Sequence, residues 1–158
     1  MYKMFLILVL LVSKLNPVTA QGNWELKVEK DGIKVYVSQI PGSKINAIKV
    51  ECDLYATVSQ LVALVMDVNT ATDWVYRLKS CTLIKQVSPC ELYYYAEVSL
   101  PWPAENRDFV CHLTVTQNPA TKVVTIDGPA VKGFVPLKTD IVRISKSNGL
   151  SHQSELIK

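Results

Sequence analysis

Hydrophobic and polar positions alternate along residues 92–115, in two segments that a proline-rich corner separates. Before the corner, one face collects Leu92, Tyr94, Ala96, Val98 and Leu100, and the other collects Tyr93, Tyr95, Glu97 and Ser99. After it, one face collects Phe109, Cys111, Leu113 and Val115, and the other collects Asp108, His112, Thr114 and Thr116. This period of two predicts a pair of half-buried strands. Because Pro101 and Pro103 cannot donate to a ladder, the sheet must bend between them.

The same alternation predicts three strands upstream. A hairpin is expected over residues 24–37, turning at Asp31-Gly32. A third strand follows over residues 45–55, where charged residues alternate with a hydrophobic set that we expect to face inward. That inward set is Ile48, Val50, Cys52 and Leu54.

The period then changes to that of a helix. Thr57 and Gln60 have the spacing of a capping box, and hydrophobic residues recur at helical spacing up to Asp67 or Val68. A short second helix is expected over residues 71–77, and strands over 81–87, 123–127 and 140–145. The order predicts one α+β domain with an antiparallel sheet and its helices early in the chain.

The corner also carries a motif. Pro101-Trp102-Pro103, followed by residues 106–110 with the sequence Asn-Arg-Asp-Phe-Val, resembles the P-x-P…N-R-D-[FY]-V signature of START domains, the lipid-carrying branch of the helix-grip superfamily. The resemblance runs from about Trp24 to Ile144 and includes Asp73-Trp74 and residues 141–143. It implies a curved antiparallel sheet around an apolar cavity that takes one lipid molecule, with short helices after the third strand.

The resemblance suggests which inward positions line that cavity. They are Tyr94, Val98, Arg107, Phe109, Cys111 and Leu113. For each, ordinary core packing is the competing interpretation. Arg107 has the parity of Phe109, so its guanidinium must either meet a polar headgroup or pair with Glu105, Asp67 or Asp73. Sterol-carrying relatives often have a further arginine where this chain has Leu113, which weakens a sterol assignment.

The pattern ends early compared with the family. START domains normally continue after the last Val-Arg strand with a tryptophan-bearing strand, another strand and a long C-terminal amphipathic helix, whereas residues 149–158 show no period. We therefore expect residues 21–148 to form an incomplete START-like domain followed by an aberrant tail. A natural short variant and a truncated reading frame both explain this ending. An uncovered apolar sheet face would favour an oligomer.

The first twenty residues have the composition of a secretory signal peptide. Lys3 precedes a short apolar run over residues 4–12, and small residues stand before a cleavage point after Ala20. The expected product is exported, either periplasmic or secreted. Without the leader's lysines the chain is close to neutral, so no basic cluster indicates nucleic acid as a partner. Transient membrane contact is compatible with a lipid carrier.

The sequence gives little indication of a structural disulfide, a metal site or a bound cofactor. The four cysteines, Cys52, Cys81, Cys90 and Cys111, allow three disulfide pairings in an oxidising compartment, yet Cys52 and Cys111 have core positions and a structural disulfide is not expected. No C-x-x-C spacing predicts a metal site, and no nucleotide-binding motif predicts a cofactor.

No catalytic residues are assigned, because His112 is predicted to face outward and His152 lies in the tail. The sequence thus predicts a non-enzymatic protein that binds, and in one version transfers, a lipid or other hydrophobic small molecule. The alternatives are an enzyme on the helix-grip fold, resembling a cyclase or hydrolase, and a non-functional truncated product.

Overall fold

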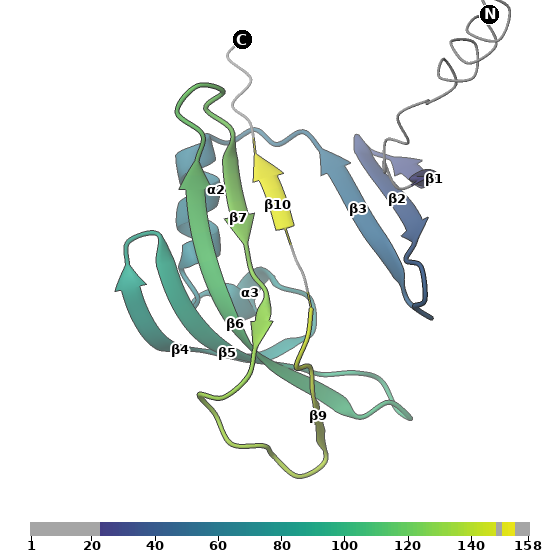
Figure 1. Cartoon of the computed structure of the whole chain (residues 1–158), viewed down its shortest axis with the longest axis vertical. Helices are drawn as coiled ribbons and strands as arrows, with labels where there is room; N and C mark the ends of the chain where they lie inside the picture. Colours follow the sequence, from purple (N-terminus) through teal and green to yellow (C-terminus); the bar gives the residue numbers. More distant parts are fainter. Residues whose placement is uncertain (1–22, 148–149, 154–158) are drawn as a thin grey trace, which may run out of the picture. The chain divides into compact units, whose positions relative to one another are not determined.

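The computed structural model describes residues 23–147 and 150–153 of the 158-residue chain (Figure 1). The expected leader, and all of the expected tail except residues 150–153, lie outside the described residues. The chain divides into two compact units, one up to Leu54 and one from Tyr55 onward, and each is described by itself.

The first unit begins with the predicted hairpin. β1 (Glu25–Lys30) and β2 (Ile33–Gln39) pair antiparallel across the Asp31-Gly32 turn. Asp31 and Gly32 both have positive φ, 51° and 78°, which is the conformation that two-residue hairpin turns require. β3 (Asn46–Cys52) pairs with β2 and gives a three-stranded sheet in the order β1-β2-β3.

The expected burial of the third strand is wrong. Ile48 is 69% exposed, Val50 55% and Leu54 60%, and Cys52 is exposed as well. The strand also ends at Cys52, so Leu54 lies beyond it. Alternation correctly places Ile48, Val50 and Cys52 on one face of β3, but a single layer of sheet cannot cover its own apolar face within this unit.

The second unit opens with the predicted capped helix, α2 (Val58–Met66). The Thr57 side chain accepts from the backbone N–H of Gln60, and the Gln60 side chain accepts in return from the backbone N–H of Thr57, so the capping box is complete. The chain leaves the helix at Asp67 and forms one more short turn, α3 (Ala71–Trp74).

A curved antiparallel sheet makes up most of this unit. Its strands are β4 (Leu78–Ser88), β5 (Glu91–Val98), β6 (Asn106–Gln117), β7 (Val124–Asp127), β8 (Ala130–Val131), β9 (Ile141–Arg143) and β10 (Leu150–Gln153). Among the described residues the order is β10-β7-β6-β5-β4, with β8 and β9 also pairing to β6. One detail differs from the prediction, because β9 runs parallel to β6.

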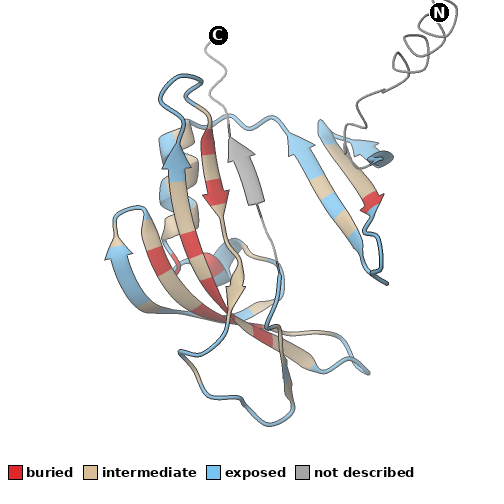
Figure 2. Ribbon diagram, viewed as in Figure 1, coloured by how far each residue is buried: buried red, intermediate tan, exposed pale blue. Residues whose placement is uncertain are grey.

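The hydrophobic core lies between α2 and one face of this sheet, which we call the inner face. Figure 2 shows that the buried residues concentrate on β5, β6 and β7. The buried members of the core cluster are Val68, Leu92, Cys111, Leu113, Val124 and Ile126. Val58, Val62 and Val65 of the helix pack against this cluster, as their spacing on one helical face predicts.

Part of the opposite, outer face is buried as well, contrary to the half-buried strands that the alternation predicts. Tyr95 is 7% exposed, Glu97 3%, Asp108 1% and Val110 0%. The cause is the chain after β7, which we call the strap (residues 128–143). It returns to β6 through β8 and β9 and places side chains against the outer face of β5.

Among the described residues, neither helix is long and apolar enough to span a bilayer.

Candidate functional site

All six residues that the sequence singles out lie on one ladder of the inner face. Four direct cross-strand pairs of β5 and β6 make up this inner ladder: Leu92 with Leu113, Tyr94 with Cys111, Ala96 with Phe109, and Val98 with Arg107. The register therefore brings the predicted residues together across two strands. Whether they line a cavity for a ligand stays a prediction.

Burial falls along the inner ladder from the Leu92–Leu113 pair, in which both residues are buried, to the Val98–Arg107 pair, in which neither is, although Ala96 between them is 0% exposed. Leu92, Cys111 and Leu113 belong to the core cluster beneath α2. Tyr94 and Phe109 are only partly buried and pack against that cluster, with their rings edge to face at 6.2 Å. Val98 and Arg107, at the far end, are partly buried and lie outside the core cluster.

The polar groups at the middle of the ladder are neutral at ordinary pH. Burial raises the pKa of the Tyr94 hydroxyl far above its usual range. Burial also raises the pKa of the Cys81 thiol to about 11 and raises that of Cys111. A ligand against this stretch would meet hydrophobic and neutral side chains, with Arg107 the one charged member of the ladder.

Arg107 does not form the ion pair that the sequence analysis offers as an alternative. Its Nη1 donates to the backbone oxygens of Glu105, at 2.7 Å, and Asn106, at 3.4 Å. Among the residues that the structure describes, neither Glu105 nor Asp67 nor Asp73 forms a salt bridge with it. The local turn into β6 brings the guanidinium back onto the main chain instead.

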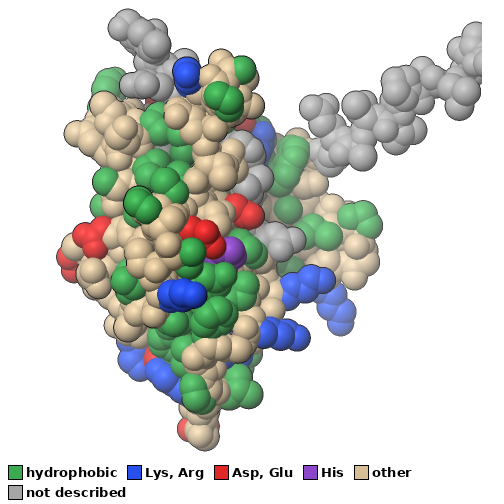
Figure 3. Space-filling view, turned by 60° about the vertical axis from the view of Figure 1, so that its left-hand side comes forward, with side chains coloured by type: hydrophobic (Ala, Val, Ile, Leu, Met, Phe, Trp, Pro, Cys, Tyr) green, Lys and Arg blue, Asp and Glu red, His purple; other side chains and the backbone are tan. Residues whose placement is uncertain are grey.

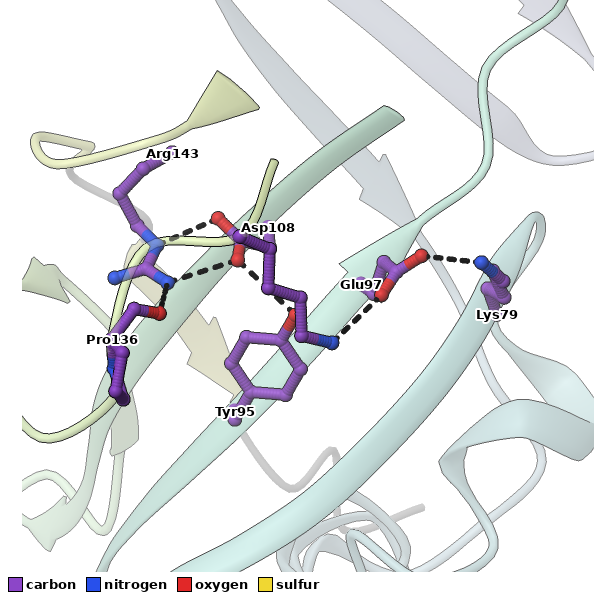
Figure 4. Close-up of polar contacts among 7 residues, drawn as sticks. Lys79, Tyr95, Glu97, Asp108, Pro136 and Arg143 are labelled. Carbon is purple, nitrogen blue, oxygen red and sulfur yellow. Dashed lines mark hydrogen bonds and ion pairs between the residues drawn. The ribbon is translucent and has the colours of Figure 1, made fainter. Parts of the chain in front are cut away.

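The buried ion pair of this region lies on the outer face. Arg143 donates from Nε to Asp108 Oδ1 at 2.6 Å and from Nη2 to Asp108 Oδ2 at 2.9 Å, a two-pronged contact (Figure 4). The Tyr95 hydroxyl lies 3.1 Å from Asp108 Oδ2. Arg143 also donates to the strap's own backbone oxygens at Val135 and Pro136. The hydrogen bond from Arg143 holds the pKa of Asp108 below its usual range.

Glu97 forms a second charged contact beside the first. It accepts from Lys79 at 2.6 Å and from Lys138 of the strap at 3.1 Å, as Figure 4 shows for Lys79. The Lys138 ammonium also lies 4.7 Å from the centre of the Tyr95 ring. These hydrogen bonds, the one from Lys79 foremost, lower the pKa of Glu97. Two buried carboxylates are therefore neutralised by cations, two of which come from the strap.

The sequence did not predict this network of ion pairs, although Asp108 and Arg143 both stand in segments that it singled out. Asp108 stands in the Asn-Arg-Asp motif and Arg143 in the last predicted strand. Their contact depends on the parallel register of β6 and β9, which places Asp108 opposite Arg143. Alternation gives the face of a residue but not its partner strand, so no local signal could have paired them.

His112 is less exposed than the sequence predicts. Its ring stacks on Tyr93, with centroids 4.3 Å apart, and its Nε2 lies 2.8 Å from Glu91 Oε1. The ring of Phe134, from the strap, also stacks on Tyr93, with the two ring centroids 4.7 Å apart. Figure 3 shows hydrophobic side chains gathered on the face that is turned forward, with acidic and basic ones among them. Among the described residues there is no cluster of three or more metal-ligating side chains.

Comparison with known proteins agrees with this geometry. The family model for the START domain matches residues 11–127, more than half of the chain. The chain belongs to the START domain family. The matched range begins within the expected leader and ends before β9, whereas the motifs quoted above continue to residue 144.

Two bacterial proteins are similar in sequence. A crystal structure of a StAR-related lipid transfer protein from Xanthomonas axonopodis (fragment 25–204) superposes with a TM-score of 0.76 at 31% identity, covering 82% of this chain and 72% of that one. An uncharacterised protein of Pseudomonas aeruginosa is 32% identical over 127 residues, which are 80% of this chain and 62% of that protein. This START chain thus spans less than two thirds of that relative's length.

The fold extends to more distant proteins. Human StAR-related lipid transfer protein 5 superposes with a TM-score of 0.63 over 94% of this chain and 77% of its own, at 16% identity. Such low identity shows a shared fold alone.

Proposed function

We propose that this START domain binds one lipid or other hydrophobic small molecule against the partly buried residues of the inner ladder, and that it does so without catalysis. Membership of the START family supports ligand binding in general. The proposal is assigned to this site because burial decreases along the inner ladder. Leu92 and Leu113 are buried under α2, whereas Tyr94, Phe109 and Val98 are only partly buried.

Partly buried apolar side chains suit a hydrophobic ligand. Removing apolar surface from water contributes about 25 cal/mol per Å², so a few hundred Å² of ligand is enough for useful affinity without a charged contact. The neutral hydroxyl of Tyr94 and thiol of Cys111 add weak polar contacts at no cost in charge burial.

Native mass spectrometry of the protein purified from its cells, followed by organic extraction of the bound fraction, tests the proposal. The expected result is a protein mass with one discrete bound lipid. Phe109→Asp places a charge on the ladder and should abolish the bound mass. Leu113→Asp is the poorer test, because Leu113 belongs to the core cluster and its loss would unfold the domain.

A matched control is available on the same strand. Thr116→Asp puts the same acid on β6 but on the opposite, exposed parity, and should leave the bound lipid in place. An empty wild-type protein, or a Phe109→Asp variant that is folded and still carries lipid, contradicts the proposal.

We further propose that the protein is exported with cleavage after Ala20, on the composition of residues 1–20. N-terminal sequencing of the mature protein should begin at Gln21. A mature protein that retains Met1, or that stays in the cytoplasm of its host, contradicts this.

A further inference from the structure

Two arginines approach neighbouring residues of β6, and the structure uses them differently. Arg143 directs Nε and Nη2, the edge of the guanidinium that fits a carboxylate, at both oxygens of Asp108. Arg107 stands one residue before Asp108 on β6, and its contacts among the described residues all come from Nη1. Among the described residues, the edge that Arg143 uses on a carboxylate therefore makes no hydrogen bond on Arg107.

The acids close to Arg107 in the sheet are already neutralised. Asp108 is held by Arg143, and Glu97, its direct cross-strand neighbour, is held by Lys79 and Lys138. Glu105 offers Arg107 only its backbone oxygen. The positive charge of Arg107 thus has no counter-charge among the described residues, while its Nη1 is anchored to the main chain.

Arg107 also has a defined place relative to the proposed ligand. By alternation along β6 it shares the inner face with Phe109 and Cys111, and it pairs with Val98 at the least buried end of the inner ladder. The ladder runs from a dry hydrophobic end at Leu92 and Leu113 to this single cation. Such a gradient matches an amphiphile that has a hydrocarbon tail and one negative head.

We propose that Arg107 binds the anionic head of the ligand, a carboxylate or phosphate group, through its Nε and Nη2 edge, with the hydrocarbon tail lying along the inner ladder toward Leu92. This rests on the lipid-binding function proposed above and adds a ligand class and an orientation to it. An anchored, planar guanidinium loses little freedom on binding and contacts an oxyanion with two parallel hydrogen bonds.

The test compares two ligands with the same tail, palmitate and hexadecanol, by displacement of the neutral fluorophore N-phenylnaphthylamine from the full chain. Wild-type protein should bind palmitate at least about tenfold more tightly than hexadecanol, the size expected of a hydrogen-bonded charge contact. Arg107→Gln should lose this preference and keep its affinity for hexadecanol. Arg107→Lys should keep part of it, since lysine retains the charge without the fork.

Two controls distinguish an effect of the protein's overall charge from an effect of the site at Arg107. Lys85→Gln removes one exposed positive charge from β4 of the same sheet and should leave the preference unchanged. Inorganic phosphate alone, added as a competitor, should not displace palmitate, because binding needs the tail as well as the head. Thermal melts of each variant show whether it is folded.

The outcomes are distinguishable. Equal affinities of wild type for palmitate and hexadecanol, or a preference that persists in Arg107→Gln, overturn the role of Arg107 and leave lipid binding intact. Displacement by phosphate alone overturns the proposed orientation in favour of a simple anion site. Binding of neither amphiphile overturns the proposed function and this inference together.

Discussion

Glu97 and Asp108 lie directly opposite each other on β5 and β6, and both are buried. Like charges in facing positions of a sheet repel, so this pair is stable only because cations contact each of its members. Lys79 supplies one, and the strap supplies the others as Lys138 and Arg143. The acid pair thus makes the stability of the outer face depend on the strap.

Arg143→Met should destabilise the domain strongly. It leaves the buried Asp108 without its two-pronged partner, and breaking a buried ion pair on one side costs about 3–5 kcal/mol. Urea unfolding followed by tryptophan fluorescence measures the loss. The double variant Asp108→Asn with Arg143→Met should recover part of it, because no buried charge is then left unpaired. A single-variant loss below about 1 kcal/mol would contradict the assignment.

Acid should weaken the folded state through the same two carboxylates. The pKa of Asp108 and that of Glu97 are both lowered in the folded protein, by Arg143 and Lys79 first of all. A lowered folded pKa stabilises the protein above the unfolded values, about 3.9 for Asp and 4.3 for Glu, and that stabilisation is lost as the pH falls below them. Unfolding free energies measured between about pH 6 and pH 3 should therefore decrease. The variant with Glu97→Gln and Asp108→Asn should show a shallower decrease, and an unchanged slope would rule out these groups as the cause.

Gly128→Ala should destabilise the start of the strap. A Cβ at Gly128 would lie 3.1 Å from Cys111 Sγ and 3.5 Å from Leu113 Cδ1, inside a packed core. Overpacking of this kind costs about 1–3 kcal/mol, measurable as a lower melting temperature. Adding Cys111→Ala removes the closer contact, so the double variant should be more stable than the sum of the two single losses predicts. Strict additivity would show that the crowding is elsewhere.

Thr57→Ala should cost about 1 kcal/mol of unfolding free energy. The substitution removes the side-chain acceptor of the Gln60 N–H at the start of α2, the helix that covers the core cluster. Chemical denaturation of the variant measures the loss, with Ser59→Ala in the same first turn as the control. Equal effects of the two substitutions would mean that the capping box contributes nothing beyond helix propensity.

Local rules of the sequence are enough for most elements. The Asp31-Gly32 turn, the Thr57-Gln60 capping box and the period of two over residues 92–115 each depend on contacts within a few residues, and the structure confirms all three. The six predicted site residues also come together, because two adjacent strands joined by one corner leave little freedom of register.

The tertiary structure was needed to determine which residues are buried and which side chains contact each other. Ile48 and Val50 share a face as predicted but remain exposed, whereas Glu97 and Asp108 on a polar face are buried beneath the strap. The sequence by itself determined which strands and helices form and which residues share a face, since these follow from backbone periodicity. Only the tertiary structure decided which faces are covered and that Arg143, not Arg107, pairs with a carboxylate side chain among the described residues. Both depend on contacts between segments far apart in the chain, where β9 lies parallel to β6.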